Sequence, residues 1–591
     1  MITLSMFQAH LNATAPLPPS TSRSVNGQER YLLKLLTTLP SQTQAQQIEH
    51  LERVLTVLRK ANIDEEQRLK LMAKVIDASG RLIATLRQHY IYETGVLSQA
   101  QMNYVAHIQS LHYLIIMVYD RVIRHETQWS DNQLKPFSGK GWQRYFGTDR
   151  KPSSIIAIAA YQSLLRYQKL LAEEALCYQK PSNYLWSRVN QLYYLAHQNG
   201  VVDIDLSIYT ATHQAHSIHQ LYCQICLQHL LNLRAMRRPN ILLVQRLLPE
   251  WSKHMIATIE PATETRVYVD LNSNKPPSYL TANSTINPYE DRYDCLFIEL
   301  TPMVLYFNSR KQAFLEEEST GIEYSLLNII SMIISYRYLQ PPLTLPTKYS
   351  SKQSAELITG FNDIHYHVGD SKSFGNIIAM KDLREEERPL YNTSDKERDH
   401  DNALTIETFE NHDNSSLYRI LRLLPKDGAL NTADISKESI NEDGITKQSI
   451  SVEGSDPDFT TTAPPPLHIM GLILVYRSAN VVQPDWSIGV VRWINLDSKN
   501  PEVEWQILGH QLVACGLRLE GDKTRSRHFV PAFILGKDDQ LQTVGTLIVP
   551  PAYFQVDDRV VMRIGNKQTS LRLGRRLMMT DEFSQYEVVQ L

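Results

Sequence analysis

The sequence has few cysteines, almost no net charge and no long hydrophobic run. Five cysteines in 591 residues are too few for a disulfide-stabilised scaffold, so we expect a reducing compartment. A net charge of -3 gives no overall attraction to nucleic acid or acidic lipid. The strongest membrane candidate, YLIIMVY at 113–119, is far shorter than the roughly 20 apolar residues of a spanning helix. The N-terminus lacks the basic start and apolar core of a signal peptide, so we expect a cytoplasmic protein without a membrane span.

Motifs for catalysis are also missing. The sequence contains no G-x-S-x-G, no HExxH, no GxxxxGK[ST] and no predicted strand followed by GxGxxG, which favours a non-enzymatic protein. His219, Cys223 and Cys226 share one face of a predicted helix, and zinc takes such ligands. A structural zinc site usually draws ligands from two elements, so we interpret this segment as an ordinary amphipathic helix and expect no metal or cofactor.

The first half of the chain has a helical pattern. Residues 1–27 are rich in proline, serine and threonine and are expected to be disordered. Over 28–340, apolar residues recur every three or four positions, as in IEHLERVLTVLRKAN. This spacing predicts an α-helical bundle or solenoid, with a short β-containing segment near 263–306. A proline-rich stretch after residue 340 marks the end of this domain.

The second half of the chain has a β pattern. Short apolar runs alternate with turn residues, among them DIHYHV, NIIAM, LYRILRLL and SIGVVRWINL. Their number and spacing predict a β-barrel domain at 341–520 and a small additional β subdomain at 521–591. Polar insertions are expected at 384–416 and 431–466. The predicted fold class is therefore α+β and multidomain, with a helical half followed by the β domains.

These β runs resemble, in order, the strands of PilZ domains. The closest detail is WSIGVVRWI at 486–494, followed after a short loop by VEWQILG at 503–509. The resemblance covers roughly 340–520 and extends loosely to the last 70 residues. It implies a PilZ-like β-barrel that receives cyclic di-GMP, in bacterial second-messenger signalling linked to type IV pili or surface behaviour.

The PilZ resemblance also implies two ligand-binding elements. The first, Arg-x-x-x-Arg, clamps phosphate and stacks on guanine, and Lys348 and Lys352 stand at the matching positions. The second is an Asp/Asn-x-Ser-x-x-Gly turn, of which only Gly428 fits by strand order. Arg419 and Arg422, just before this turn, would supply the missing guanidinium groups. The candidate ligand-binding residues are therefore Lys348, Lys352, Arg419, Arg422 and Gly428.

Two further stretches have ligand-like chemistry. DWSIGVVRW at 485–493 holds Asp485, Ser487 and Gly489, but we interpret it as a hairpin turn that leads into a barrel strand. If Arg492 lies on the outer face of that strand, it is a solvated charge. A solvated loop and a charged barrel rim are also the preferred interpretation of the late basic residues Arg518, Lys523, Arg525, Arg527, Arg572, Arg575 and Arg576.

Two functions stay open from the sequence. One is a receptor for cyclic di-GMP, and the other is a helical-repeat scaffold that binds a protein partner and whose PilZ-like domain no longer binds nucleotide. Convergence of Lys348 and Lys352 with Arg419 or Arg422 would favour the receptor, whereas pairing with carboxylates would favour the scaffold. RNA binding is disfavoured, because the helical part has no basic stripe with interleaved aromatic residues.

Overall fold

The computed structural model describes two compact units. The first lies within Met1–Met303 and the second begins at Val304. In the described part of the chain, no helix is long and apolar enough to cross a membrane. The described residues are 1–13, 25–133, 154–209, 215–259, 265–280, 286–290, 294–316, 322–339, 351–389, 404–410, 418–423, 467–477, 485–496, 501–510, 512–521, 527–536, 545–551 and 553–590.

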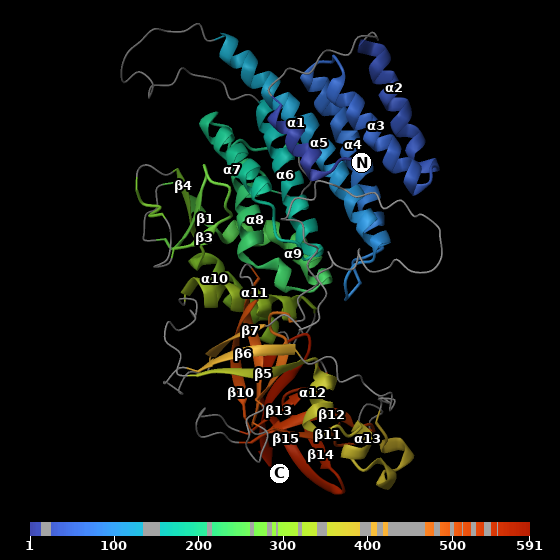
Figure 1. Ribbon diagram of the computed structural model, residues 1–591, viewed down its shortest axis with the longest axis vertical. Coiled ribbons are helices and arrows are strands. Elements are labelled where there is room, and N and C mark those ends of the chain that lie inside the picture. Colours follow the sequence, from blue (N-terminus) through green and yellow to red (C-terminus); the bar gives the residue numbers. More distant parts are fainter. Residues whose placement is uncertain are drawn as a thin grey trace, which may run out of the picture. The chain divides into compact units, whose positions relative to one another are not determined.

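The first unit is mainly a helical bundle (Figure 1). At its centre α5 packs along α6; α1, α3 and α4 contact α5, and α7, α8 and α9 contact α6. The predicted helical half is therefore confirmed. The helices are α1 (Leu4–Asn12), α2 (Val25–Thr38), α3 (Gln44–Lys60), α4 (Glu65–Arg87), α5 (Gln99–Gln133), α6 (Ser154–Leu176), α7 (Asn183–Gln198), α8 (Ile218–Leu230) and α9 (Arg238–Trp251).

Local sequence sets where α3 and α4 begin. Thr43 caps α3 in a capping box with Gln46, and the Asp64 carboxylate accepts the Glu66 N–H at the start of α4. The apolar spacing of α3 forms its buried stripe, made of Ile48, Leu51, Val54, Leu55 and Leu58.

The N-terminal residues differ from the expected disordered segment. Residues Leu4–Asn12 form α1, and Phe7 is fully buried and stacked on Tyr113, with 4.6 Å between ring centroids. The composition of 1–27 as a whole hid this helix, because its prolines all follow residue 13. Leu4, Phe7 and Leu11 have the spacing of a helix face.

A small antiparallel sheet follows the helices of the first unit. Its strands are β1 (Ile256–Thr258), β2 (Val267–Asp270), β3 (Ser278–Tyr279) and β4 (Cys295–Glu299), in the order β1-β4-β2-β3. The buried Asn190 of α7 donates to the carbonyls of Ser273 and Lys275, at 3.1 and 3.0 Å. This amide ties the loop after β2 to the helical bundle.

The second unit contains two closed β-barrels, preceded by α10 (Thr301–Glu316) and α11 (Ile322–Leu339). The first barrel has the order β10-β7-β6-β5-β8-β9, with β5 (Ser351–Thr359), β6 (Leu404–Glu410), β7 (Tyr418–Leu423), β8 (Leu472–Arg477), β9 (Asp485–Asn495) and β10 (Glu502–Gly509). The second has the order β11-β12-β13-β16-β15-β14, with β11 (Leu512–Leu519), β12 (Val530–Leu535), β13 (Thr546–Val549), β14 (Arg559–Ile564), β15 (Lys567–Met579) and β16 (Ser584–Gln590). These barrels confirm the predicted fold class.

The structure places several borders at other residues than the sequence predicts. The helical domain was expected to reach residue 340, but α10 from Val304 and α11 group with the barrels. The first barrel ends at Gly509, and β11 already belongs to the second barrel, so the border lies before residue 520. The segment 384–416 contains β6, whose buried Ile406 lies among polar neighbours that mask the strand. The insertion 431–466 lies outside the described residues.

The runs DIHYHV and NIIAM are not strands. DIHYHV lies in α12 (Phe361–Val368), and NIIAM begins in the last turn of α13 (Phe374–Ile377); both helices pack on β11 of the second barrel. The His365 ring nitrogen lies 3.1 Å from the Cys515 carbonyl oxygen, and the Arg563 Nε donates to the Ile378 carbonyl at 2.7 Å. Tertiary packing therefore overrode the β propensity of these short apolar runs.

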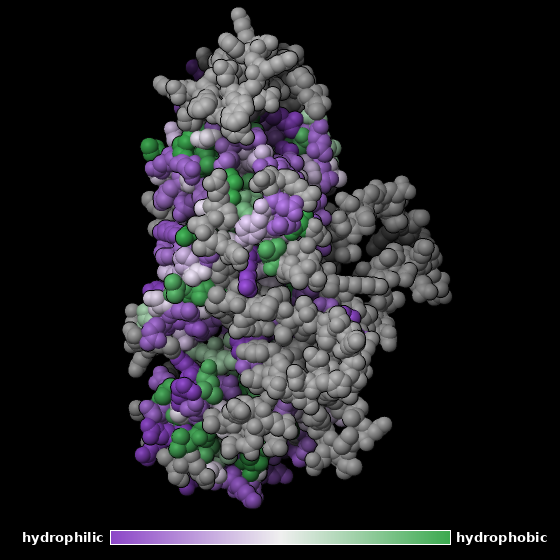
Figure 2. Space-filling model, turned by 90° about the vertical axis from the view of Figure 1, so that its left-hand side faces the viewer, coloured by the Kyte–Doolittle hydropathy of each residue, from purple (hydrophilic) through white to green (hydrophobic). Residues whose placement is uncertain are grey.

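Hydrophobic surface is divided into small areas on the face that Figure 2 shows. Hydrophobic residues form separate patches there among hydrophilic ones, as expected for a globular protein whose apolar residues fill its cores.

The stretch DWSIGVVRW is a strand along its whole length, and the predicted turn at its start is wrong. Gly489 pairs with Ile473 on one side and Ile507 on the other, in the middle of β9. A Cβ atom at Gly489 would overlap with the carbonyl of Gln506 and the ring of Trp505. This glycine is therefore needed for close packing inside the barrel, not for reading a ligand.

Replacing Gly489 with alanine should destabilise the second unit by about 1–3 kcal/mol, because Trp505 is almost fully buried and has no room to move. Thermal unfolding measures the effect. Gly545→Ala is the matched control, since the nearest atom to its Cβ would lie at an ordinary 3.7 Å. Equal melting temperatures for the two variants would contradict the packing described here.

Candidate functional site

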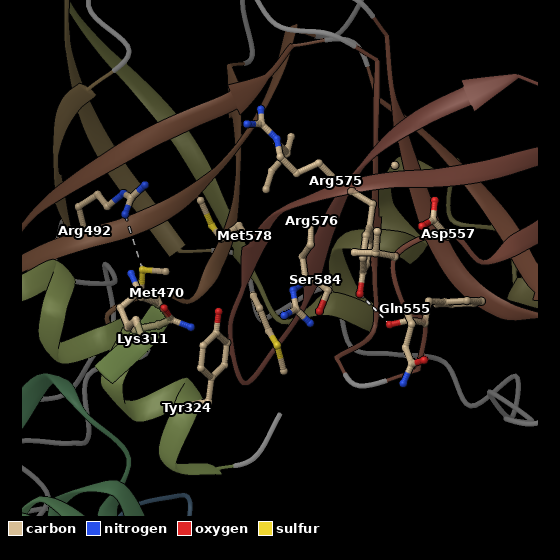
Figure 3. A pocket seen from close by; sticks show the side chains of 17 residues that line it. Lys311, Tyr324, Met470, Arg492, Gln555, Asp557, Arg575, Arg576, Met578 and Ser584 are labelled. Atoms are coloured by element: carbon tan, nitrogen blue, oxygen red, sulfur yellow. Dashed lines mark hydrogen bonds between the residues drawn. The ribbon is translucent and has the colours of Figure 1, made fainter. Parts of the chain in front are cut away.

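A cavity in the second unit combines cationic, aromatic and apolar side chains (Figure 3). Its volume is about 900 Å³, within the range of small-molecule sites. Residues of α10, α11, β9, β15 and β16 line it, together with the loop before β14. The cationic residues of its lining are Lys311, Arg492, Arg575 and Arg576, and the aromatic residues are Tyr324, Phe554 and Tyr586.

A break in strand register brings Arg492 to the cavity. In the pairing of β9 with β10, Val491 faces Trp505 and Trp493 faces Glu504, so the register skips Arg492. An extra residue of this kind is a β-bulge, which changes the direction of a side chain. The Arg492 guanidinium lies 3.8 Å from the Met470 sulfur, at the cavity wall in Figure 3.

The second barrel supplies its cations from a similar irregularity. Along β15 the register with β16 shifts between Leu573 and Arg576, and again between Arg576 and Met578. Arg575 and Arg576 lie in this irregular part of the strand, next to Gly574. Both barrels therefore present arginine to the cavity where their regular ladders are interrupted.

The helical side of the cavity adds a ring and an amine. The Arg576 guanidinium carbon lies 5.8 Å from the centroid of the Tyr324 ring, within the range of a cation–π contact. Burial lowers the pKa of Lys311, and the nearby Arg492 charge lowers it further. The site thus places like charges close together, as an anion-binding site requires.

Carboxylates neutralise only part of the rim. Arg575 is 75% exposed and pairs with Glu587 at 2.9 Å, while the cavity-lining Asp557 accepts from the Arg572 Nε at 3.0 Å. These ion pairs occupy the outer edge. Lys311 and Arg492 also line the cavity, where the Arg492 charge lowers the pKa of Lys311.

Tyr586 is a buried aromatic residue of the cavity lining. Its hydroxyl donates to the Phe554 carbonyl at 2.7 Å. Burial raises the pKa of Tyr586, so the phenol stays neutral, although the neighbouring Arg576 opposes this rise. The described geometry therefore suits a ligand with negative charge and flat rings.

Three of the residues predicted from the sequence lie on strands of the first barrel and not in the cavity lining. Lys348 and Gly428 lie outside the described residues. Lys352 is on β5 opposite Phe409, and Arg419 is on β7 opposite Trp505. Arg422 pairs with Glu502 at 2.9 Å and with Glu407 at 3.9 Å. For Arg422, this pairing with carboxylates favours the scaffold function. The ligand-binding role of all five residues stays a prediction.

Sequence reasoning missed the cavity residues. Arg492 is interpreted from the sequence as a solvated charge only if it lies on the outer face of its strand, and Arg575 and Arg576 are interpreted as part of a solvated rim. Arg575 is exposed, but Arg492 and Arg576 are half-buried in the cavity lining. Gly574 inside a strand pattern, next to paired arginines, was the signal for a bulge that redirects charges.

The helix with histidine and cysteine has the contacts of a packed core. His219 Nδ1 lies 2.8 Å from the Tyr193 hydroxyl, and its Nε2 lies 3.8 Å from the Cys223 sulfur. Burial raises the pKa of Cys223 to about 12, so its thiol stays protonated. In the described part of the chain, no three histidine, cysteine or acidic side chains come together as a metal site.

Comparison with known proteins identifies both ends of the chain. Residues 30–262 match the family described as "Cyclic-di-GMP receptor FimW, N-terminal domain", and residues 515–591 match "FimW C-terminal beta-barrel domain". Both matches are therefore to domains of FimW. It is also 22% identical to the cyclic-di-GMP receptor FimW of Pseudomonas aeruginosa, over 98% of this chain and 93% of that protein. No solved structure matches the chain.

Only part of the cavity lining falls within the regions that match FimW domains. Its β15 and β16 residues lie within the matched C-terminal β-barrel domain, whereas Lys311, Tyr324 and Arg492 lie between the two matched regions. The matched β-barrel domain begins within β11, which agrees with the second barrel and not with a border at residue 520.

Replacing Lys311 with methionine should raise the thermal stability of the protein without ligand at pH 7. The unfolded lysine holds its proton up to about pH 10.4, whereas the folded one releases it at a lower pH, so its charge opposes folding at pH 7. The gain should shrink as the pH rises towards 10, where the unfolded lysine also begins to lose its proton. Lys381→Met, at an exposed position, is the control. A gain that is the same at pH 7 and pH 10 would contradict this explanation.

Proposed function

We propose that this protein is a non-enzymatic receptor for cyclic di-GMP that binds its ligand in the cavity between the barrels and α10–α11. The observation that carries the proposal is the convergence of Lys311, Arg492 and Arg576 with aromatic rings in one cavity. The match to FimW domains and to a cyclic-di-GMP receptor supports the ligand class.

The chemistry of the ligand fits this lining. Cyclic di-GMP carries two phosphodiester charges and two flat guanine bases. Arginine binds phosphate oxygens through a two-pronged guanidinium and also stacks on flat rings. Tyr324 offers an aromatic face beside Arg576, and Met470 and Met578 add adaptable apolar contacts. Ligand phosphate would also relieve the repulsion between Lys311 and Arg492.

The proposal includes an output as well as a ligand. The PilZ resemblance points to bacterial signalling, in type IV pilus or surface behaviour, and the helical unit is the proposed docking part for a protein partner. α10 and α11 contribute Lys311, Tyr324 and Asn328 to the cavity, so a bound ligand would contact helices as well as strands.

Arg492→Met combined with Arg576→Met should abolish most cyclic di-GMP binding. Each charge-assisted hydrogen bond contributes about 1.5–3 kcal/mol, so each substitution should weaken binding by roughly tenfold or more. Calorimetric titration of the full chain measures this. Arg559→Met, an exposed arginine on β14 outside the cavity lining, is the matched control. Unchanged affinity in the double variant would exclude the cavity as the binding site.

Lys348→Ala combined with Lys352→Ala tests the alternative position of the ligand. If the PilZ-type motif binds phosphate, this variant should lose affinity by about tenfold or more, while the Arg492/Arg576 variant keeps it. We expect the opposite result: the Lys348/Lys352 variant should keep its affinity and the Arg492/Arg576 variant should lose it. The reason is that Lys311 and Arg492, whose charges act on each other, both line the cavity.

The scaffold function predicts a different result in the same titration. The pairing of Arg422 with Glu407 and Glu502 favours it, since a phosphate would have to displace two carboxylates there. If the unmodified protein shows no heat of binding with cyclic di-GMP, the receptor proposal fails and the scaffold replaces it.

A further inference from the structure

Buried arginines of the first unit have acceptors built around them. Arg68, with no exposed surface, donates to the Ala61 carbonyl at the end of α3 and to the Glu65 carboxylate. Arg238 donates to the Leu176 carbonyl at the end of α6. Helix C-termini leave carbonyls without intrahelical donors, so these guanidinium groups satisfy both partners.

Arg166 lacks such acceptors. It lies on α6 and is only 2% exposed, yet its Nε atom is buried without a hydrogen-bond partner in the described structure. The described residues also provide no carboxylate within ion-pair distance of its guanidinium. The neighbours that act on its pKa are the phenols of Tyr119 and Tyr161, and burial is the main cause of its lowering. An isolated buried cation is strongly unfavourable, so the arrangement calls for an anion.

Other groups with positive charge or N–H donors surround Arg166. His112 on α5 is fully buried, and neither of its ring nitrogens has a hydrogen-bond partner among the described residues. The charges of Arg166, Lys169 and Arg87 all act on this ring. Burial, together with the charges of Arg166 and Arg87, lowers the pKa of Lys169 to about 7, although Glu173 opposes this shift.

The neighbouring acids compensate this charge only in part. Glu173 on α6 is bound by Arg87 of α4 and by the Tyr90 hydroxyl, the latter at 2.6 Å. Burial raises the pKa of Glu174 to about 8, so this carboxyl is mostly protonated at neutral pH. Lys169 is half-buried, which places one member of the cluster at the edge of the core.

We propose that Arg166, His112 and Lys169 form an anion-binding site inside the helical unit, separate from the cavity of the barrels. It would take a small oxyanion, such as inorganic phosphate or a phosphate group. The guanidinium of Arg166 supplies a two-pronged donor, a neutral His112 supplies one N–H, and Lys169 supplies the charge nearest the solvent.

Inorganic phosphate is the probe. The protein carries Arg492→Met and Arg576→Met, so that the barrel cavity does not contribute, and thermal unfolding is followed with and without phosphate at constant ionic strength. We expect phosphate to raise the unfolding temperature of this background. Adding Arg166→Met or Lys169→Met should remove the rise and weaken phosphate binding in calorimetry by at least tenfold. Lys74→Met, at an exposed position of α4, is the control and should keep the rise.

The outcomes separate a built site from a general salt effect. Arg166→Met should fold as well as the background without phosphate, because it removes an uncompensated buried charge. If that variant fails to fold, Lys169→Met is sufficient by itself to test the site. A rise of equal size in the background, in the tested variant and in Lys74→Met overturns the proposal, as does the absence of any rise in the background. None of these results depends on cyclic di-GMP binding.

Discussion

Closure of each barrel is the constraint on which the second unit depends. In a closed barrel every strand has a neighbour on both sides, so no sheet edge stays open for a ligand or for another chain. Functional groups must then come from loops or from interruptions of the ladder. The cavity uses both: Arg492 stands where β9 skips a register position, and Arg576 pairs with Tyr586 between two register shifts of β15.

In the helical unit, as in the barrels, backbone polar groups need hydrogen-bond partners. Helix ends expose carbonyls, and buried arginines such as Arg68 and Arg238 donate to them. A guanidinium in such a place is a structural part, because its charge and its donors are used up by the fold. In contrast, a guanidinium that the fold leaves without acceptors has donors to spare, as at Arg166. The hydrogen-bond acceptors around a buried arginine therefore indicate whether its role is structural or ligand binding.

Sequence periodicity predicted the helices, one barrel and a further β subdomain, because buried faces repeat every 3.6 or every two residues. It failed where tertiary context decides. DIHYHV resembles a strand, but its Ile364 and His365 are buried against the second barrel as part of a helix. The alternation of side chains between the two faces of a strand holds only where the strand is regular. The register shift in β9 therefore prevents alternation from predicting where the Arg492 side chain points. Lys311 and Arg576 are 265 positions apart, and no local pattern predicts that they line one cavity.

The packing of α12 and α13 has a consequence for synthesis. In the sequence these helices lie between β5 and β6 of the first barrel, yet the carbonyl that His365 contacts is 150 residues later in the chain. Phe374, Ile378 and Leu383 likewise form one apolar cluster with Phe529. At roughly 5–20 residues per second, a ribosome needs roughly 8–30 s to make that intervening chain. During this interval the apolar side of α12–α13 lacks the residues that bury it. The nascent protein can therefore aggregate or bind a chaperone there until β11 and Phe529 have been made.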